Sequence, residues 1–446
     1  MTQSTIYALS SLYGKSGVAV FRLSGEKSLA AVAKMTSLNT QNILPRHAYF
    51  AAIYDLAGNM LDHGLVVYFK APASFTGEDV VEFHTHGSKA VIASMLENFS
   101  QLEGCRLAEP GEFSKRAFYN QKMDLTEAEG LADLIDAETR EQQKYALRQM
   151  GGELKNLYEG WRADLVNVMA YLEAYIDFPD EEIPDNITEK LENTVFKVRA
   201  AIGEHLRQNR SGERLRDGFR VVIVGEPNVG KSSLLNCLAR REAVIVSDIA
   251  GTTRDAIDVY MDINGFPVIF TDTAGLRDTD EQIEQKGIEI AYDKAKNADL
   301  IIALSDVQNI NQKTFADLVT DCKNKIIYVY NKADTIDFEQ CSKNLSAGSI
   351  LISAKNQQGI NELLELISRR IAAEMNNGSG ALITRQRYRE VLNDVFKALE
   401  QFNLQKSIEL AAEDVRLAAR SLGKITGVIE VDEILDKIFG SFCIGK

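Results

Sequence analysis

The sequence has few cysteines, few prolines and no long uninterrupted apolar run. Its five cysteines lie far apart and form no CxxC pair, which argues against a disulfide framework and against a zinc ribbon. No stretch reaches the roughly 18 consecutive apolar residues of a membrane span, and the first residues, "MTQSTIYALSSLYGKSG", lack the basic and apolar regions of a signal peptide. We therefore expect a cytoplasmic protein with reduced thiols and no membrane partner.

An excess of positive charge is missing as well. The 446 residues include 64 acidic and 50 basic side chains, which gives a formal net charge of -14 at pH 7. A surface that binds nucleic acid all over needs clustered Lys and Arg, so any such contact is expected only through local basic patches. The hydrophobic share of 45% and the charged share of 26% are those of an ordinary globular protein.

The hydrophobic pattern changes character three times along the chain, which predicts a multidomain protein of α+β and α/β domains. The predicted domains are residues 1–119 (α+β), 120–216 (helical), 217–375 (α/β with a parallel sheet) and 376–446 (helical). The last segment is short for an independent domain. We therefore expect the α/β domain to be inserted into one helical domain built from both flanking segments; two separate bundles are the alternative.

Helical periodicity is clearest on the two sides of the α/β segment. Thr126 and Glu129 have the spacing of a capping box, which predicts a helix start at this point. The stretch "FPDEEIPDN" interrupts the helical pattern. No proline follows Pro267, so no ring constraint breaks the helices of the last segment.

A phosphate-binding loop is the strongest local signal. The stretch "GEPNVGKS", Gly225 to Ser232, fits GxxxxGK[ST] and stands between an apolar strand and a helix predicted to begin near Lys231. In such a loop the backbone N–H groups surround the phosphates, the lysine reaches the β- and γ-phosphates, and the serine ligates Mg²⁺. The alternative, a chance match in a glycine-rich turn, becomes remote once the motifs that follow are considered.

Three more motifs follow in the order that a guanine-nucleotide domain requires. "DTAG", Asp272 to Gly275, would hold Mg²⁺ through water and sense the γ-phosphate. "NKAD" ends at Asp334 and "SAK" ends at Lys355, and each follows an apolar strand. An aspartate that accepts from N1 and the 2-amino group of guanine rejects adenine, because adenine would leave the carboxylate unpaired. The predicted nucleotide is GTP, and the four motifs resemble those of Ras-like P-loop domains in the TRAFAC class of GTPases.

One part of the usual hydrolytic machinery is absent. Leu276 follows "DTAG", where Ras-like enzymes carry the glutamine that orients the attacking water. An apolar side chain cannot orient water, so the water must be positioned from elsewhere. Arg254 in "GTTRD" is near in sequence, but a salt bridge within the loop is the interpretation that we favour for it.

The chain as a whole resembles the MnmE family of tRNA modification GTPases, also called TrmE. The resemblance is carried by "GEPNVGKSSLLN", "SDIAGTTRD", "DTAGLR", "PASFTGEDVVEFHTHG", "EPGEFSKRAF", "FPDEEI" and the terminal "FCIGK". It implies a potassium-activated GTPase that acts as a homodimer with a flavin-dependent partner of the MnmG (GidA) type. The implied product is an aminomethyl or carboxymethylaminomethyl group on carbon 5 of the wobble uridine of certain tRNAs. The alternative is a GTPase switch in ribosome assembly, like Era or EngA.

The resemblance also implies how hydrolysis proceeds without the glutamine. Asn228 would coordinate K⁺ in the place of an arginine finger, and Glu284 would position the water. Ser247, Ile249 and Thr252 would help to hold K⁺, and Thr253 would join Ser232 on Mg²⁺. The family usually has Thr at the position of Ser247, and the hydroxyl is retained. The motifs and the resemblance together place the following residues around GTP: Gly225, Asn228, Val229, Gly230, Lys231, Ser232, Ser233, Ser247, Asp248, Ile249, Ala250, Gly251, Thr252, Thr253, Asp272, Thr273, Ala274, Gly275, Asn331, Lys332, Ala333, Asp334, Ser353, Ala354 and Lys355.

The N-terminal domain resembles the folate-binding and dimerisation domain of the same family. A 5-formyl- or 5,10-methylene-tetrahydrofolate would supply a one-carbon unit, and Arg22, Glu82, Lys122 and Lys446 match the residues around it. Glu82 can pair with the pterin, and the cations can meet the carboxylates of the glutamate tail. The tail "FCIGK" would bring Lys446 and Cys443 to this site. The expected catalytic residues of the chain are Glu284, Lys231, Asn228 and Cys443; for Cys443, chemistry and simple packing of the tail are equal alternatives.

The pair of histidines in "HTHG" also invites a metal interpretation. His84 and His86 alternate on a predicted strand, with no Cys, Asp or third His at ligand spacing. We therefore interpret them as structural histidines.

Overall fold

The computed structural model describes residues 4–178, 185–207, 211–241, 258–272, 296–309, 325–336, 349–375, 380–405, 407–429 and 432–445. The chain divides into two compact units, which are described one at a time. The first unit comprises Met1–Ala132, Met150–Glu159 and Leu422–Lys446; the second comprises Asp133–Gln149 and Gly160–Ser421.

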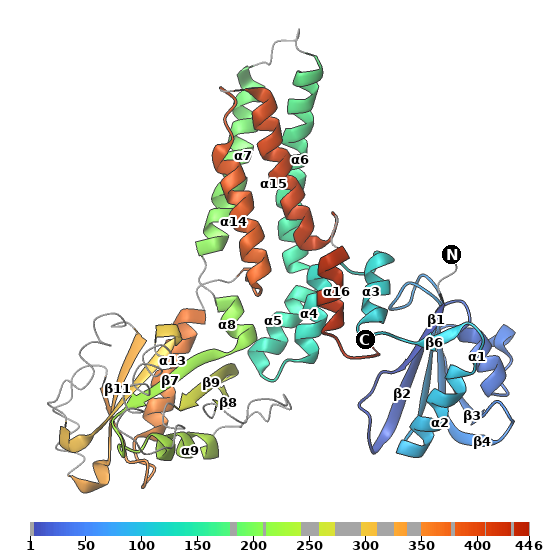
Figure 1. Cartoon of the computed structure of the whole chain (residues 1–446), viewed down its shortest axis with the longest axis horizontal. Coiled ribbons are helices and arrows are strands. Elements are labelled where there is room, and N and C mark those ends of the chain that lie inside the picture. Colours follow the sequence, from blue (N-terminus) through green and yellow to red (C-terminus); the bar gives the residue numbers. More distant parts are fainter. Residues whose placement is uncertain are drawn as a thin grey trace, which may run out of the picture. The chain divides into compact units, whose positions relative to one another are not determined.

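The first unit is built on a six-stranded sheet with the order β3-β4-β5-β2-β1-β6 (Figure 1). Its strands are β1 (Thr5–Leu9), β2 (Ser16–Ser24), β3 (Ala48–Tyr54), β4 (Met60–Phe69), β5 (Val80–Gly87) and β6 (Cys105–Leu107). Only β1 and β6 pair in parallel; the other neighbours are antiparallel. This mixed sheet, with the helices α1 (Ser28–Met35) and α2 (Lys89–Ser100) and the 3-10 turn η1 (Thr40–Asn42), is the expected α+β domain.

The two faces of this sheet differ because side chains alternate along each strand. On β2 and β5, Phe21, Leu23, Val81 and Phe83 are fully buried in the core that also contains residues of α1 and α2. The intervening residues, such as Arg22, lie on the other face. The face away from α1 and α2 is therefore the one that offers polar groups to a ligand.

Helices complete the first unit around a second, smaller core. The helices are α3 (Glu112–Tyr119), the beginning of α4 (Leu125–Ile135), the beginning of α6 (Glu153–Asp177) and α16 (Asp432–Gly440). Leu125, Ala128, Leu435, Phe439 and Phe442 are buried together. This packing attaches the C-terminal segment to the chain that follows the N-terminal sheet.

The start of α4 differs from the predicted one. The carboxylate of Asp124 accepts the N–H of Glu127 at 2.7 Å, and the carboxylate of Glu127 accepts the N–H of Asp124 at 2.7 Å. This is a capping box two residues before the predicted Thr126 to Glu129 pair, which was wrong. Aspartate is at least as good an N-cap as threonine, and it stands directly before the first helical residue.

The second unit contains a six-stranded sheet with the order β12-β11-β10-β7-β9-β8. Its strands are β7 (Phe219–Gly225), β8 (Asp258–Ile263), β9 (Phe266–Asp272), β10 (Leu300–Asp306), β11 (Ile326–Asn331) and β12 (Ser349–Leu351). All neighbours are parallel except β8 and β9, which form a hairpin. Asn264 and Gly265 at its tip have φ angles of 52° and 90°, and a two-residue type I′ hairpin turn requires such positive values at both positions.

The helices of the second unit lie before, within and after the segment that forms this sheet. They are α5 (Arg140–Met150), α6, α7 (Asp185–Arg207), α8 (Ser211–Asp217), α9 (Lys231–Arg241), α13 (Ile360–Met375), α14 (Gln386–Gln401) and α15 (Ile408–Thr426); short 3-10 turns are η2 (Val307–Asn309) and η4 (Ala333–Thr335). Helix α7 precedes the sheet and α14 follows it, and the two contact each other along their lengths (Figure 1). The hydroxyl of Tyr145 also donates to the carbonyl oxygen of Leu382 at 2.5 Å, joining α5 to the segment after α13. The predicted fold class, an α/β domain inserted into a helical domain, is confirmed; the four domain boundaries stay predictions.

No helix in the described part of the chain is long and apolar enough to cross a bilayer.

Candidate functional site

The phosphate-binding loop joins the end of β7 to the start of α9. Gly225 lies so close to β10 that a Cβ on it would stand 2.5 Å from the carbonyl oxygen of Leu304. Asn228 and Gly230 have φ angles of 64° and 99°, in the left-handed region. The ammonium of Lys231 donates to the carbonyl oxygens of Gly225 at 2.8 Å and Glu226 at 2.9 Å. The loop therefore curls around its own lysine, the arrangement that turns successive N–H groups toward a phosphate.

Asn331 connects this loop to both base-recognition motifs. Its side-chain amide donates to the carbonyl oxygen of Val229 at 2.8 Å, and its side-chain oxygen accepts the N–H of Ala354 at 3.0 Å. The residue is 3% exposed. A Cβ on Gly230 would stand 2.3 Å from the amide nitrogen of Asn331, so only glycine fits there. One buried side chain thus sets the spacing between the phosphate end and the base end of the site.

The carboxylate that would read the base is held in place by the motif after β12. The Ser353 hydroxyl donates to Oδ1 of Asp334 at 2.7 Å, and Nζ of Lys355 lies 4.0 Å from Oδ2. The hydrogen bond from Ser353 is the largest influence that lowers the pKa of Asp334. Nearby, Lys332 forms an ion pair with Asp306 at 2.8 Å. Asp334 is therefore an ionised acceptor with a fixed orientation, as guanine recognition requires.

These motifs open onto one cavity of about 590 Å³. Its lining residues are Asn228, Gly230, Ser233, Asn236, Cys237, Arg240, Asn331, Lys332, Asp334, Thr335, Ala354, Lys355 and Gln357. The structure thus brings together the predicted residues of the phosphate loop, "NKAD" and "SAK". It adds residues that the sequence analysis missed, notably Asn236 and Arg240. Their spacing of three and seven from Ser233 on α9 was a signal that could have identified them.

Other predicted residues are placed only in part. Ser232 begins α9 beside Lys231, and Asp272 is the last residue of β9. Several predicted residues lie outside the described residues: Ser247, Asp248, Ile249, Ala250, Gly251, Thr252, Thr253, Thr273, Ala274, Gly275, Glu284 and Lys446, together with Arg254 and Leu276. Their roles stay predictions.

The first unit brings the predicted Arg22 and Glu82 into direct contact. They are cross-strand partners on β2 and β5, and the guanidinium binds Oε1 of Glu82 with Nε at 3.0 Å and Nη2 at 2.9 Å. The other oxygen, Oε2, lies 3.1 Å from Nε2 of His84. Burial would raise the pKa of Glu82, but His84 and Arg22 outweigh it and hold the pKa below its usual range. Both oxygens of this carboxylate are engaged, so a ligand would meet an ordered ionic group.

The two histidines of "HTHG" each lie against a carboxylate. His84 contacts Glu82, and Nδ1 of His86 lies 2.8 Å from Oδ1 of Asp62. His84 thus contacts a carboxylate of its own strand, β5, and His86 contacts one of the neighbouring strand, β4.

Aromatic rings enclose Arg22 and lead to Lys122. The Arg22 guanidinium lies 5.4 Å from the ring centre of Phe75 and 5.8 Å from that of Phe113. The Lys122 ammonium donates to the carbonyl oxygen of Pro72 at 3.0 Å. Phe75 and Lys122 also line an open hollow of about 790 Å³, together with Arg46, Ala48, Val67, Phe69, Ala73 and Ser74. Phe75 thus connects the Arg22–Glu82 pair to the hollow that Lys122 lines. The folate-binding role of Arg22, Glu82 and Lys122 stays a prediction.

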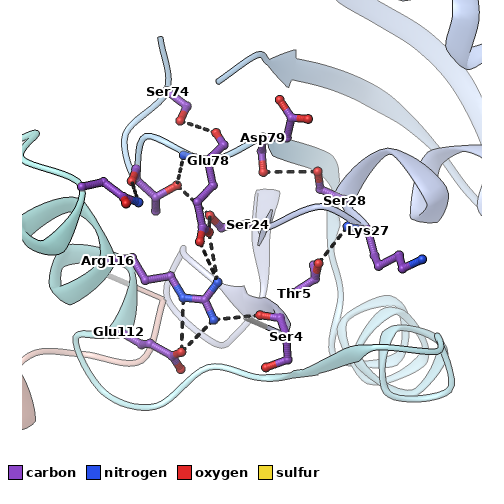
Figure 2. A network of polar contacts seen from close by, with 12 residues as sticks. Ser4, Thr5, Ser24, Lys27, Ser28, Ser74, Glu78, Asp79, Glu112 and Arg116 are labelled. Carbon is purple, nitrogen blue, oxygen red and sulfur yellow. Dashed lines mark hydrogen bonds and ion pairs between the residues drawn. The ribbon is translucent and has the colours of Figure 1, made fainter. Parts of the chain in front are cut away.

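A buried ionic network supports the loop that carries Phe75. Figure 2 shows Arg116 on α3 between the carboxylates of Glu78 and Glu112, each 3.0 Å away. The side chain of Arg116 is 5% exposed. Glu78 also accepts from the Ser24 hydroxyl at 2.6 Å, so the loop is joined to β2 as well as to α3. The network fixes the segment that lies beside Arg22.

The C-terminal tail docks at the end of β1. The carbonyl oxygen of Gly445 accepts the Ser10 hydroxyl at 3.1 Å, and Phe442 is buried against Phe439 with ring centres 5.5 Å apart. Ala8, two residues before Ser10, is the cross-strand partner of Arg22. Cys443, between these anchors, is exposed. The structure thus places the tail near Arg22 and leaves the thiol accessible.

Comparisons with known proteins agree along the whole chain. A family model described as the MnmE helical domain matches residues 125–443, and one described as the TrmE N-terminus matches residues 5–122. The tRNA modification GTPase MnmE of Orientia tsutsugamushi is 47% identical over 451 residues and covers 100% of both chains; that of Paramagnetospirillum magneticum is 48% identical and covers 99% of both. Among solved structures, Aquifex aeolicus Era bound to GDP and aluminium fluoride matches 40% of this chain and 66% of its own, with 27% identity and a TM-score of 0.28. The two family models and the full-length relatives show that this chain belongs to the MnmE (TrmE) family of tRNA modification GTPases.

Proposed function

We propose that this chain binds and hydrolyses GTP as part of a reaction that modifies tRNA. The observation that carries the proposal is the position of Asn331, which ties the phosphate loop to both base motifs within one cavity. The full-length relatives are named as tRNA modification GTPases. We correspondingly expect the protein to be located in the cytoplasm, where tRNA is abundant.

Each described motif has a distinct role in this proposal. Asp334 accepts the N1 and 2-amino hydrogens of guanine. Lys231 exchanges its carbonyl partners for the β- and γ-phosphates, because a phosphate is the stronger acceptor for an ammonium. Ser232 and Thr253 would ligate Mg²⁺, with Asp272 behind a water. Bound Mg²⁺ neutralises the charge that develops on the phosphates.

For hydrolysis we propose the potassium-dependent arrangement of the family. Asn228 lines the cavity and offers a neutral amide oxygen, the type of ligand that a monovalent cation accepts. Ser247, Ile249 and Thr252 would supply the remaining ligands. The loop that contains them would close when the GTP-binding α/β domain (G domain) of a second chain packs against it. Glu284 would orient the water that Leu276 cannot.

Turnover in potassium and in sodium at constant ionic strength tests this arrangement. We expect faster hydrolysis in potassium, association of G domains with GDP and aluminium fluoride, and a loss of the potassium effect in Asn228→Ala. Equal rates in both salts, or hydrolysis by Asn228→Ala at the parent rate, would contradict the role of potassium and favour Arg254 as the source of the positive charge.

Glu284→Ala tests the positioning of the water. It should reduce hydrolysis strongly and leave GTP affinity nearly unchanged, because the residue acts on water. A loss of GTP binding would show that Glu284 is structural.

For the first unit we propose a site for 5-formyl- or 5,10-methylene-tetrahydrofolate. Arg22, Glu82, Lys122 and Lys446 would surround the folate, and Cys443 would lie beside it. Bound, the folate would supply a one-carbon unit. Arg22→Ala, or removal of the last six residues, should abolish modification without lowering GTP affinity. Normal tRNA modification by the truncated chain would show that the tail has no such role.

We further propose that the chain works as a homodimer with a flavin-dependent partner of the MnmG type. The product would be an aminomethyl or carboxymethylaminomethyl group on carbon 5 of the wobble uridine. The alternative, a switch in ribosome assembly, gives no reason for the first unit or for the docked tail. Mass analysis of nucleosides from a deletion strain decides between them: hypomodified wobble uridine favours the first, and precursor ribosomal subunits with normal tRNA favour the second.

A further inference from the structure

The open hollow beside the Arg22–Glu82 pair contains two cations with no acidic partner. Arg46 donates from Nη2 to the carbonyl oxygen of Ala73 at 3.0 Å, and Lys122 donates to that of Pro72 at 3.0 Å. Neither forms an ion pair with a carboxylate anywhere in the described part of the chain. By contrast, Arg22, Arg106 and Arg116 of the same unit are each paired with a glutamate. Asp79 lies at the same loop, where it accepts the N–H of Ala71 at 2.9 Å, but it forms no ion pair with either cation. The described residues that line the hollow thus include two cations and no carboxylate.

The two cations are also close to each other. Their acceptors are the carbonyl oxygens of consecutive residues, Pro72 and Ala73. Consecutive Cα atoms are about 3.8 Å apart, so the two cationic groups lie within roughly 10 Å of one another. Two like charges at this separation repel, and a ligand with one anionic group beside each of them would remove that repulsion.

The position of Arg46 is fixed by the backbone. Its N–H donates to the carbonyl oxygen of Tyr68 on β4 at 2.7 Å, just before β3 begins. Its φ angle is 63°, a left-handed conformation that is uncommon for a residue other than glycine. Residues held in such conformations are concentrated at ligand sites, where the surrounding bonds maintain them. This conformation gives an independent reason to assign Arg46 a binding role.

The hollow is continuous with the proposed folate head site. Ala48, Val67, Glu82 and Arg22 are successive cross-strand partners on β3, β4, β5 and β2, so their side chains share one face of the sheet. Ala48 and Val67 line the hollow, and Phe75 both lines it and contacts Arg22. A ligand with its head at Glu82 can thus extend across Val67 and Phe75 toward Arg46. Such a ligand would have a ring that packs on Phe69 and Phe75 and, after the ring, a chain of carboxylates.

We infer that the hollow binds the glutamate tail of the folate and that Arg46 selects poly-γ-glutamate forms over the form with a single glutamate. The inference rests on the proposed folate site. Lys122 meets the carboxylates of the first glutamate. Arg46 stands just before β3, two strands away from the strand of Glu82, so it meets a carboxylate that only a longer tail possesses. The selectivity is electrostatic, so it weakens as salt screens the charges.

Calorimetric titration of the full-length protein with 5-formyl-tetrahydrofolate mono- and triglutamate tests the inference. For the parent protein we expect the triglutamate to bind about fivefold more tightly at low salt, the size of one partly exposed charge-assisted contact. Arg46→Ala should remove this advantage and leave the monoglutamate affinity unchanged, whereas Lys122→Ala should weaken both ligands. Lys70→Ala removes an exposed lysine that does not line the hollow, and it should change neither affinity.

The outcomes separate the inference from the proposed function. If the parent protein binds neither folate, the folate site itself is wrong. If it binds both equally, or if Arg46→Ala keeps the triglutamate advantage, the folate site stands and the role of Arg46 is wrong. A loss of monoglutamate binding in Arg46→Ala with an unchanged melting temperature would place Arg46 at the folate head and overturn the inference. A loss of tRNA affinity with unchanged folate binding would assign the hollow to RNA and overturn it too.

Discussion

Gly445 lies against the end of β1 so closely that a Cβ on it would stand 2.4 Å from the carbonyl oxygen of Leu9. Its φ angle of 100° is also in the region that side chains disfavour. Together with the bond from Ser10, this contact explains how the tail around Gly445 is held against the sheet. The tail depends on one glycine for its path along the sheet.

Gly445→Ala should therefore release the tail. The added methyl group clashes with backbone and adopts a disfavoured φ, which costs about 1–3 kcal/mol locally. We expect faster removal of the last residues by carboxypeptidase and loss of tRNA modification, with unchanged GTP hydrolysis. Gly440→Ala is the matched control, because nothing lies within 4 Å of a Cβ there. Equal digestion of both variants would contradict the docking of the tail through Gly445.

Asn331→Asp should weaken GTP binding without unfolding the sheet. The new carboxylate oxygen would face the carbonyl oxygen of Val229 in a buried position, so a hydrogen bond becomes a repulsion. The loss of about 1–3 kcal/mol corresponds to an affinity roughly 5- to 150-fold lower, measured with a fluorescent GTP analogue. Asn264→Asp at the exposed hairpin tip should bind normally: the Asn264 amide donates to the Ser368 hydroxyl, and this hydroxyl can donate to an aspartate instead. Normal affinity in Asn331→Asp would show that the phosphate loop keeps its shape without this link.

Asp124 should make the first unit less stable at neutral pH than in mild acid. Burial raises the pKa of Asp124 to about 6, from an ordinary 3.8, despite its bonds from Glu127 and Thr126. The folded state then holds this proton more tightly than the unfolded state does. The stabilisation is present below the unfolded pKa and is lost as the pH rises through the folded one, a change of up to about 3 kcal/mol.

Asp124→Asn removes this titration and keeps the acceptor for the helix N-terminus. The free energy of unfolding of the variant, relative to the parent, should rise by about 2 kcal/mol between about pH 4.5 and about pH 7.5. Denaturant titrations of the full chain at several pH values measure it, following the transition of the first unit. Asp177→Asn, at an exposed end of α6, is the control and should track the parent. Parallel pH profiles for Asp124→Asn and the parent would contradict the predicted pKa.

Arg116→Ala should destabilise the first unit strongly. It leaves the carboxylates of Glu78 and Glu112 without their shared guanidinium, and breaking a buried ion pair costs about 3–5 kcal/mol. Arg207→Ala removes the exposed pair with Glu204 and should cost less than about 1 kcal/mol. Thermal melts of both variants provide the comparison. A small effect for Arg116→Ala would mean that water enters and replaces the guanidinium.

The sequence by itself determined the local motifs and the order of the elements. The phosphate loop, "NKAD" and "SAK" are recognisable because their chemistry depends on fixed spacing over a few residues, and such spacing can be read directly. The insertion of the α/β domain was expected because helical segments flank it and the last segment is short for an independent domain, and the contact of α7 with α14 agrees with that expectation. Even here a local detail was wrong: the start of α4 is set by Asp124, two residues before the expected pair.

Only the tertiary structure decided which distant residues meet. Asn331 contacts Val229 across the sheet, Gly445 contacts Leu9 at the opposite end of the chain, and Arg46 reaches the loop beside Lys122. None of these pairs has a characteristic spacing, because strand order and cross-strand register bring them together. A hydrophobic pattern in the sequence indicates the periodicity of a single helix or strand. A contact between two elements depends on how their buried faces pack, which such a pattern does not specify.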